Sequence, residues 1–99
     1  MTKFLLLWEA DISRVPLDQK ERLKGWTTLL NMVKDDVESG RLKDWGEFPG
    51  EYAGYAIMEG TELDVLTGTE KYVPFVRFET HPVISVSQTL EGMKALSQA

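Results

Sequence analysis

The segment Lys3 to Glu9 (KFLLLWE) decides the fold, because it is a short apolar run that polar residues close on both sides. Runs of this length and composition are typical of β-strands. Successive side chains of a strand point to opposite faces, so Phe4, Leu6 and Trp8 share one face and the leucines between them occupy the other. A half-exposed strand normally alternates apolar with polar residues. The sequence therefore predicts a strand with both faces covered.

A long amphipathic helix follows a loop over Ala10 to Leu17. Asp18 is a predicted N-cap, and Glu21 three residues later completes a capping-box pattern. Apolar residues then recur at spacings of three and four, and Gly40 is a natural stop. The predicted buried face consists of Leu23, Trp26, Leu29, Leu30, Val33 and Val37.

The remaining elements are three strands and two shorter helices. Strands are predicted over Leu42 to Phe48, Ala53 to Glu59 and Val73 to Thr80, with Pro82 marking the end of the last one. Thr61 is expected to cap a helix carrying Leu63, Val65 and Leu66, and Ser85 with Gln88 to cap a C-terminal helix carrying Val86, Leu90, Met93 and Leu96.

The resulting order β-α-β-β-α-β-α predicts one ferredoxin-like α+β domain over residues 1–99. Such an order folds as a four-stranded antiparallel sheet, strand order 4-1-3-2, with two helices on one face. Two helices leave the second face of the sheet uncovered. We expect a second copy of the chain to cover it, since two-fold dimers are the commonest oligomers. The alternative is that the C-terminal helix folds back over that face.

Composition narrows the classes of function. There are no cysteines, which excludes disulfides and thiolate metal sites, and no stretch approaches the length of a membrane span. The absence of a secretory core predicts a cytoplasmic protein. A net charge of −5 argues against nucleic-acid binding. Gly54-Tyr55-Ala56 lies where an RNA-recognition motif has its key strand, but the basic residue and the later aromatics of that motif are missing.

Three segments resemble the dimeric α+β barrel superfamily, and most of all a small branch of it with no assigned function. They are the two-sided first strand KFLLLWEAD, the Gly-Tyr-Ala strand and the strand end FETHPV. The resemblance implies two sheets packed face to face, with a small organic ligand beside the sheet. Relatives include cofactor-free quinol-type monooxygenases, muconolactone-type isomerases, haem-dependent enzymes and ligand-sensing domains of regulators. Their active residues do not map onto this chain position by position, so the fold alone assigns no function.

His81 is the only histidine and the principal candidate for chemistry. Period-two spacing places Arg77, Glu79 and His81 on one strand face, and Glu59 is expected to reach the same end of the sheet. Glu59, Glu79 and His81 are therefore the candidate catalytic residues, because a carboxylate beside imidazole supports general acid–base catalysis. The alternative is an ordinary solvated strand end with a surface salt bridge. No metal site and no cofactor are expected.

Trp8, Tyr55 and Arg77 are the candidate ligand-binding residues, with the two aromatics expected beneath the second face of the sheet. Trp26 belongs to the helix stripe, and Trp45 is expected to be an exposed residue of an edge strand. The predicted function is a homodimer that binds a small organic ligand, as a cofactor-independent enzyme of monooxygenase or isomerase type. The alternative is a non-catalytic ligand-sensing or protein-interaction module.

Overall fold

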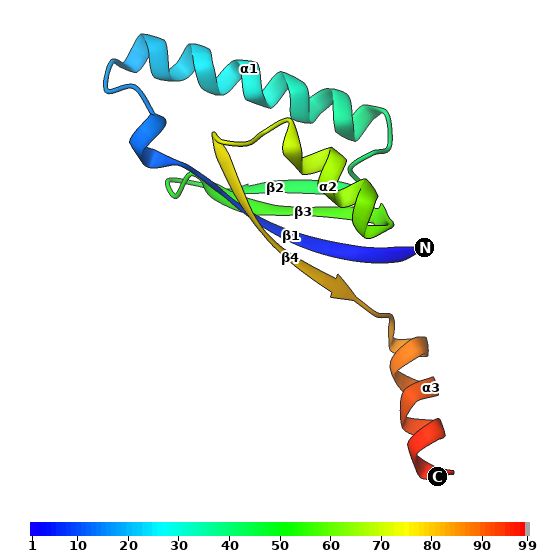
Figure 1. The fold of residues 1–99 in the computed structure, drawn as a ribbon. Helices are drawn as coiled ribbons and strands as arrows, with labels where there is room; N and C mark the ends of the chain where they lie inside the picture. The colour runs from blue at the N-terminus through cyan, green and yellow to red at the C-terminus, as the bar shows by residue number, and fades with distance from the viewer. Residues whose placement is uncertain (99) are drawn as a thin grey trace.

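The computed structural model describes residues 1–98 and shows an α+β fold built on one four-stranded antiparallel sheet (Figure 1). Its order, β2-β3-β1-β4, is the expected order read from the opposite edge. The strands are β1 (Thr2–Ala10), β2 (Asp44–Phe48), β3 (Ala53–Gly60) and β4 (Val76–Val83). β1 pairs with both β3 and β4, so the segment that decides the fold lies in the middle of the sheet.

Helices α1 (Gln19–Glu38) and α2 (Glu62–Glu70) cover one face of the sheet, and a short 3-10 turn, η1 (Ile12–Arg14), joins β1 to α1 (Figure 1). The predicted caps are confirmed. The Asp18 carboxylate accepts a hydrogen bond from the Glu21 backbone N–H, and Thr61 forms a capping box with Asp64. Such caps satisfy backbone N–H groups that have no partner inside the helix.

The core lies between the sheet and these two helices. Phe4, Leu6 and Trp8 of β1 are buried on this face beside Ala56 and Met58 of β3. Odd-numbered residues of the same strands point to the other face, as the period of a strand requires. We call that uncovered side the open face; its apolar centre is Leu5, Leu7, Tyr55 and Ile57.

Two boundary predictions were wrong. β4 begins at Val76 rather than Val73 and continues to Val83, so Pro82 lies inside the strand, opposite Phe4. A proline without a backbone N–H is tolerated there because β4 is an edge strand. The contact face of α1 is also rotated from the predicted one. Leu23 is 54% exposed and Val37 is 42% exposed, whereas Asp36 is only 3% exposed.

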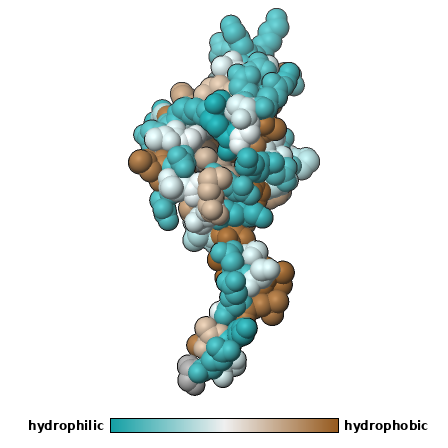
Figure 2. Space-filling model, turned by 90° about the vertical axis from the view of Figure 1, so that its right-hand side faces the viewer, coloured by the Kyte–Doolittle hydropathy of each residue, from teal (hydrophilic) through white to brown (hydrophobic). Residues whose placement is uncertain are grey.

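The third helix, α3 (Val86–Ser97), extends away from the rest of the chain (Figure 1). It therefore does not fold back over the open face, and the alternative that placed it there is wrong. The capping box predicted at Ser85 and Gln88 is present. Figure 2 shows the apolar side chains of α3 gathered on one side of the helix, where Leu90 remains 63% exposed and Leu96 70% exposed. Within residues 1–98, no helix is long and apolar enough to cross a membrane.

Candidate functional site

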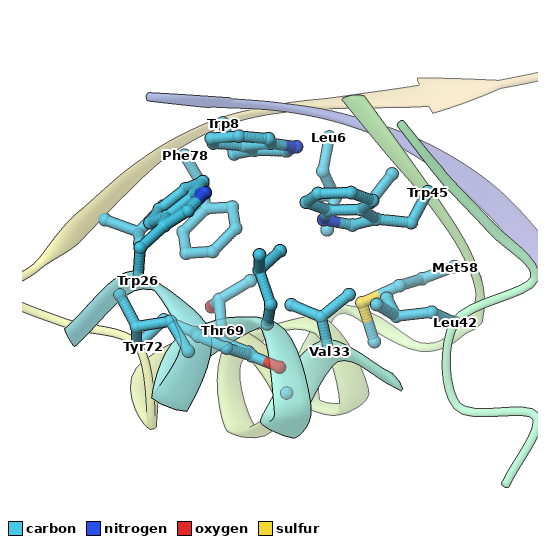
Figure 3. A pocket seen from close by; sticks show the side chains of 15 residues that line it. Leu6, Trp8, Trp26, Val33, Leu42, Trp45, Met58, Thr69, Tyr72 and Phe78 are labelled. Carbon is cyan, nitrogen blue, oxygen red and sulfur yellow. The ribbon is translucent and has the colours of Figure 1, made fainter. Parts of the chain in front are cut away.

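A narrow cavity lies between the sheet and the helices, and five of the 15 residues that line it are aromatic (Figure 3). We call it the inner cavity. Trp8 and Phe78 line it from the sheet, Trp45 from the edge strand β2, and Trp26 and Tyr72 from the helical side. Its volume of about 40 Å³ is room for two or three water molecules. An organic molecule therefore does not fit inside it without displacing side chains.

The tryptophans of the inner cavity pack against one another. Trp8 stacks on Trp45 with ring centroids 5.3 Å apart and planes 9° from parallel, and its centroid lies 5.9 Å from that of Trp26. The Trp8 indole N–H donates to the backbone carbonyls of Gly46 and Tyr55, each at 3.2 Å. These contacts fix the orientation of Trp8, so the sheet side of the cavity is a rigid aromatic surface.

A second and larger cavity adjoins the first one and shares Trp26 and Leu29 with it. This outer cavity has a volume of about 380 Å³, within the range usual for small-molecule sites. Its apolar wall comes from η1, α1, the β2–β3 turn and the segment before β4. The members of that wall are Val15, Pro16, Trp26, Leu29, Tyr52 and Phe75. Trp26 and Leu29 therefore separate the two cavities and belong to the wall of each.

Tyr52 holds an unusual backbone conformation at this cavity. Its φ of +50° lies in the left-handed region, which is uncommon for a residue other than glycine. Its ring meets Trp26 edge-on, with centroids 5.6 Å apart and planes at 80°. Strained backbone of this kind is concentrated at functional sites. Tyr52 therefore brings an aromatic edge to the point where the outer cavity meets the inner one.

Gly25 explains why the outer cavity is open. It lies in the interior of α1 on the same face as Arg22, Trp26 and Leu29, and a Cβ at this position would have no neighbour within 4 Å. A glycine inside a helix costs roughly 0.5–1 kcal/mol relative to alanine. The chain thus carries a destabilising residue where any side chain would occupy cavity space.

Charged residues of the outer cavity are two arginines and one aspartate. Arg14 Nε lies 3.3 Å from the Asp11 carboxylate, and a hydrogen bond from Ser13 holds the pKa of Asp11 below its usual value. Arg22 is half-buried and donates from Nη1 to the carbonyls of Pro16 and Leu17, at 3.3 and 3.0 Å. No carboxylate of residues 1–98 lies within ion-pair distance of Arg22. The cavity therefore has a net positive charge in a chain of net charge −5.

Behind the inner cavity lies a charge network centred on the buried Asp36, which the sequence did not predict. Asp36 accepts hydrogen bonds from Lys71 Nζ at 2.6 Å, from Arg41 Nε at 2.8 Å and from the Tyr72 hydroxyl at 2.7 Å. Burial favours the neutral acid, but these three donors outweigh it and lower the pKa of Asp36. The pKa of Tyr72 is raised well above its usual value, mainly by burial and next by the neighbouring Asp36 carboxylate. Tyr72 therefore keeps its proton and serves as a donor.

The signal for this network was present in the spacing of α1. Asp36 follows Val33 by three residues and Leu29 by seven, so it continues the stripe that begins at Trp26. A charged residue at such a position is nearly always paired when it is buried. Its partners Lys71 and Tyr72 are remote in sequence, which is why the interaction itself could not be found from the pattern.

The predicted catalytic residues all lie on the open face, away from both cavities. His81 Nε2 lies 3.6 Å from Glu79 Oε2, and both side chains are about half exposed or more. Glu59 reaches the same end of the sheet, as expected. It lies opposite Lys3 of β1, however, whereas His81 lies opposite Leu5, two residues further along β1. Because Glu59 and His81 are two strands apart and offset by two residues, their backbones are about 12 Å from each other. The structure joins Glu79 to His81 and leaves Glu59 apart.

The predicted ligand-binding residues separate in the same way. Trp8 faces the helices and lines the inner cavity, so its expected place beneath the second face was wrong. Tyr55 lies on the open face, where its hydroxyl donates to Asp44 at 2.7 Å. Arg77 also lies there and makes a 3.8 Å ion pair with Glu9 between exposed side chains. Trp45, expected to be exposed, is half-buried against Trp8.

Comparisons with known proteins assign no relative. No family model matches the chain, and no curated protein matches it. Among residues 1–98, no group of three histidine, aspartate or glutamate side chains is arranged to hold a metal ion. What can be said about function therefore rests on the two cavities, the open face and the charges around them.

Proposed function

We propose that the chain is a homodimeric protein of the ferredoxin-like, dimeric α+β barrel type that binds a small planar organic molecule in the outer cavity. The observation that carries the ligand site is the apolar cavity of about 380 Å³, which shares Trp26 with the wall of the inner cavity. A ligand seated there would lie against Trp26 and Tyr52 and direct one end toward Trp8. Flat aromatic surfaces of this kind favour planar, apolar ligands through stacked and edge-on contacts.

The residues of the cavities favour binding over catalysis. General acid–base catalysis needs a group whose pKa lies near the working pH. The outer cavity offers Asp11, whose pKa is lowered, and two arginines, while Tyr72 of the inner cavity has a raised pKa. The His81–Glu79 pair lies on the opposite face of the sheet and cannot reach a ligand in either cavity. Its acid–base role stays a prediction.

The open face and α3 support a dimer. The apolar centre of the open face is surrounded by charges of both signs, among them Lys3, Glu59, Arg77 and Glu79. An apolar centre with a polar rim is the usual composition of a protein interface. Charges of both signs also allow two copies to pair in an antiparallel way around a two-fold axis.

The area available is sufficient for such an interface. The edge strands and the C-terminal segment carry further exposed apolar residues in addition to the centre of the open face: Phe48, Val83, Ile84, Val86, Leu90, Met93 and Leu96. Together with that centre they offer an apolar surface on the order of the ~800 Å² per partner that a standard interface buries. An isolated helix of twelve residues is marginal in water, so α3 needs a partner surface.

Ligand binding can be tested by isothermal titration calorimetry with 2-naphthamide, a neutral planar probe that fits the outer cavity. At about 0.3–0.5 kcal/mol per non-hydrogen atom, the expected Kd lies between roughly 20 μM and 1 mM, with one probe per chain. Gly25→Leu should abolish binding, because a Cβ at this lining position meets no atom within 4 Å and the rest of the leucine side chain is expected to occupy cavity space. Leucine is also a better helix former than glycine, so the variant should fold.

Gly92→Leu is the matched control, because Gly92 lies inside α3 and a Cβ there also has no neighbour within 4 Å. This variant should bind 2-naphthamide with the affinity of the wild type. If the wild type releases no heat of binding, or if both leucine variants bind equally well, the ligand does not occupy the outer cavity.

A further inference from the structure

Arg22 is held in place by the loop that precedes its own helix. Its Nη1 donates to two backbone carbonyls, which are neutral acceptors, so the positive charge is positioned but not neutralised. A guanidinium carries five N–H donors in a planar fork, and this arrangement leaves several of them free. The side chain is half-buried beside Pro16, where water screens its charge less than at an exposed site.

The second arginine of the outer cavity is already paired. Arg14 is bound to Asp11, whose lowered pKa keeps the carboxylate ionised. Two positive groups and one negative group leave one excess positive charge, and Arg22 is the group without an acidic partner. The remainder of the wall is apolar and aromatic. The cavity thus combines a flat apolar surface with one uncompensated cation at its edge.

We infer that the natural ligand is a planar apolar anion, such as an aromatic carboxylate, whose acidic group binds Arg22 while its ring lies against Trp26. This rests on the proposed function, since it assigns the charge of a ligand for the same cavity. Arg–carboxylate pairs are frequently bidentate, and hydrogen bonds between charged groups are about twice as strong as neutral ones. The net charge of −5 gives an anion no general attraction to the chain, so a preference for it has to come from a local cation such as Arg22.

The test compares 2-naphthoate with 2-naphthamide, which share their ring system and differ in charge. Calorimetry on the wild type should give a Kd for 2-naphthoate about tenfold or more below that for 2-naphthamide, a preference that falls as salt is added. Arg22→Gln should bring the two affinities to within about twofold. Lys24→Gln removes one positive charge from the same helix but outside the cavity, and should leave the preference intact.

Because Arg22 also anchors a loop, the folding of each variant is checked by thermal unfolding. Arg22→Lys is a second variant at this position, and it keeps the positive charge. This lysine variant should retain part of the preference for 2-naphthoate. Equal binding of the two probes to the wild type overturns the inference and leaves the proposed function standing. An unchanged preference in Arg22→Gln assigns the anion to another site and also overturns it. If neither probe binds the wild type, the proposed function itself fails.

Discussion

Trp8 and Trp45 have different neighbours even though they stack on each other. Trp8 is 4% exposed at the centre of the sheet, whereas Trp45 is half-buried on the edge strand β2. Trp8→Ala should lower the free energy of unfolding by about 3–5 kcal/mol, as usual for a large buried aromatic. Trp45→Ala should cost about 1–2 kcal/mol, since it loses a stacked ring and partial burial.

Denaturant unfolding followed by circular dichroism measures both losses without depending on tryptophan fluorescence. Equal losses for the two variants would show that the edge of the cavity is as tightly packed as its centre. No loss for Trp45→Ala would mean that its stack on Trp8 contributes nothing to stability.

Residue patterns predicted burial well where the backbone period decides it. The alternation in β1 placed Phe4, Leu6 and Trp8 correctly on one face. Trp45 was misjudged because its burial comes from a stack on a residue 37 positions away, which no local pattern encodes. The role of Gly25 was not predicted either, because the absence of a side chain at one position does not change the apolar period of an amphipathic helix.

At the scale of elements, Asp36 connects three segments that are separated in the sequence. It connects the end of α1 to Arg41 in the following loop, and to Lys71 and Tyr72 after α2. Asp36→Ala should destabilise the fold by about 1–3 kcal/mol, because the Tyr72 hydroxyl and two partly exposed cations lose their hydrogen-bond acceptor. Asp35→Ala, at the exposed neighbouring position, should change stability by less than about 0.5 kcal/mol.

The same carboxylate predicts how stability depends on pH. Its pKa is lowered in the folded chain, so its contribution is complete above the unfolded value of about 3.9 and is lost as pH falls through the folded pKa. The difference in unfolding free energy between the wild type and Asp36→Asn should therefore be constant near neutral pH and shrink below about pH 4. A difference that stays constant down to pH 2 would show that Asp36 does not carry the charge assigned to it.

Element order and sheet order followed from the sequence, while the end of β4 and the path of α3 did not. Capping residues and turns are local signals, and they gave the four strands and three α-helices correctly, whereas η1 lies in a segment expected to be a loop. Pro82 was predicted to mark the end of the strand, but proline is accepted within an edge strand such as β4. The direction of α3 depends on what its apolar side contacts, and no segment among residues 1–98 covers that side.

For the molecule as a whole, the open face and α3 predict a dimer. Sedimentation equilibrium at micromolar concentration should give about twice the chain mass of 11.3 kDa. Leu7→Lys should shift the mass to that of one chain, because it places a charge in the apolar centre of the open face. Leu63→Lys, at an exposed position on α2 away from that face, is the control and should remain dimeric. A soluble wild-type monomer would remove the dimer and the barrel with it.

The most direct test of ligand binding uses the three indole N–H resonances that the three tryptophans give in a ¹⁵N–¹H correlation spectrum. During titration with 2-naphthoate, the Trp26 resonance should move most and along a saturable curve, because Trp26 lines both cavities. The Trp8 resonance should move less, since its N–H is bound to backbone carbonyls. Shifts confined to the open face or to α3, with all three indole resonances unmoved at saturation, would contradict a ligand site between the sheet and α1.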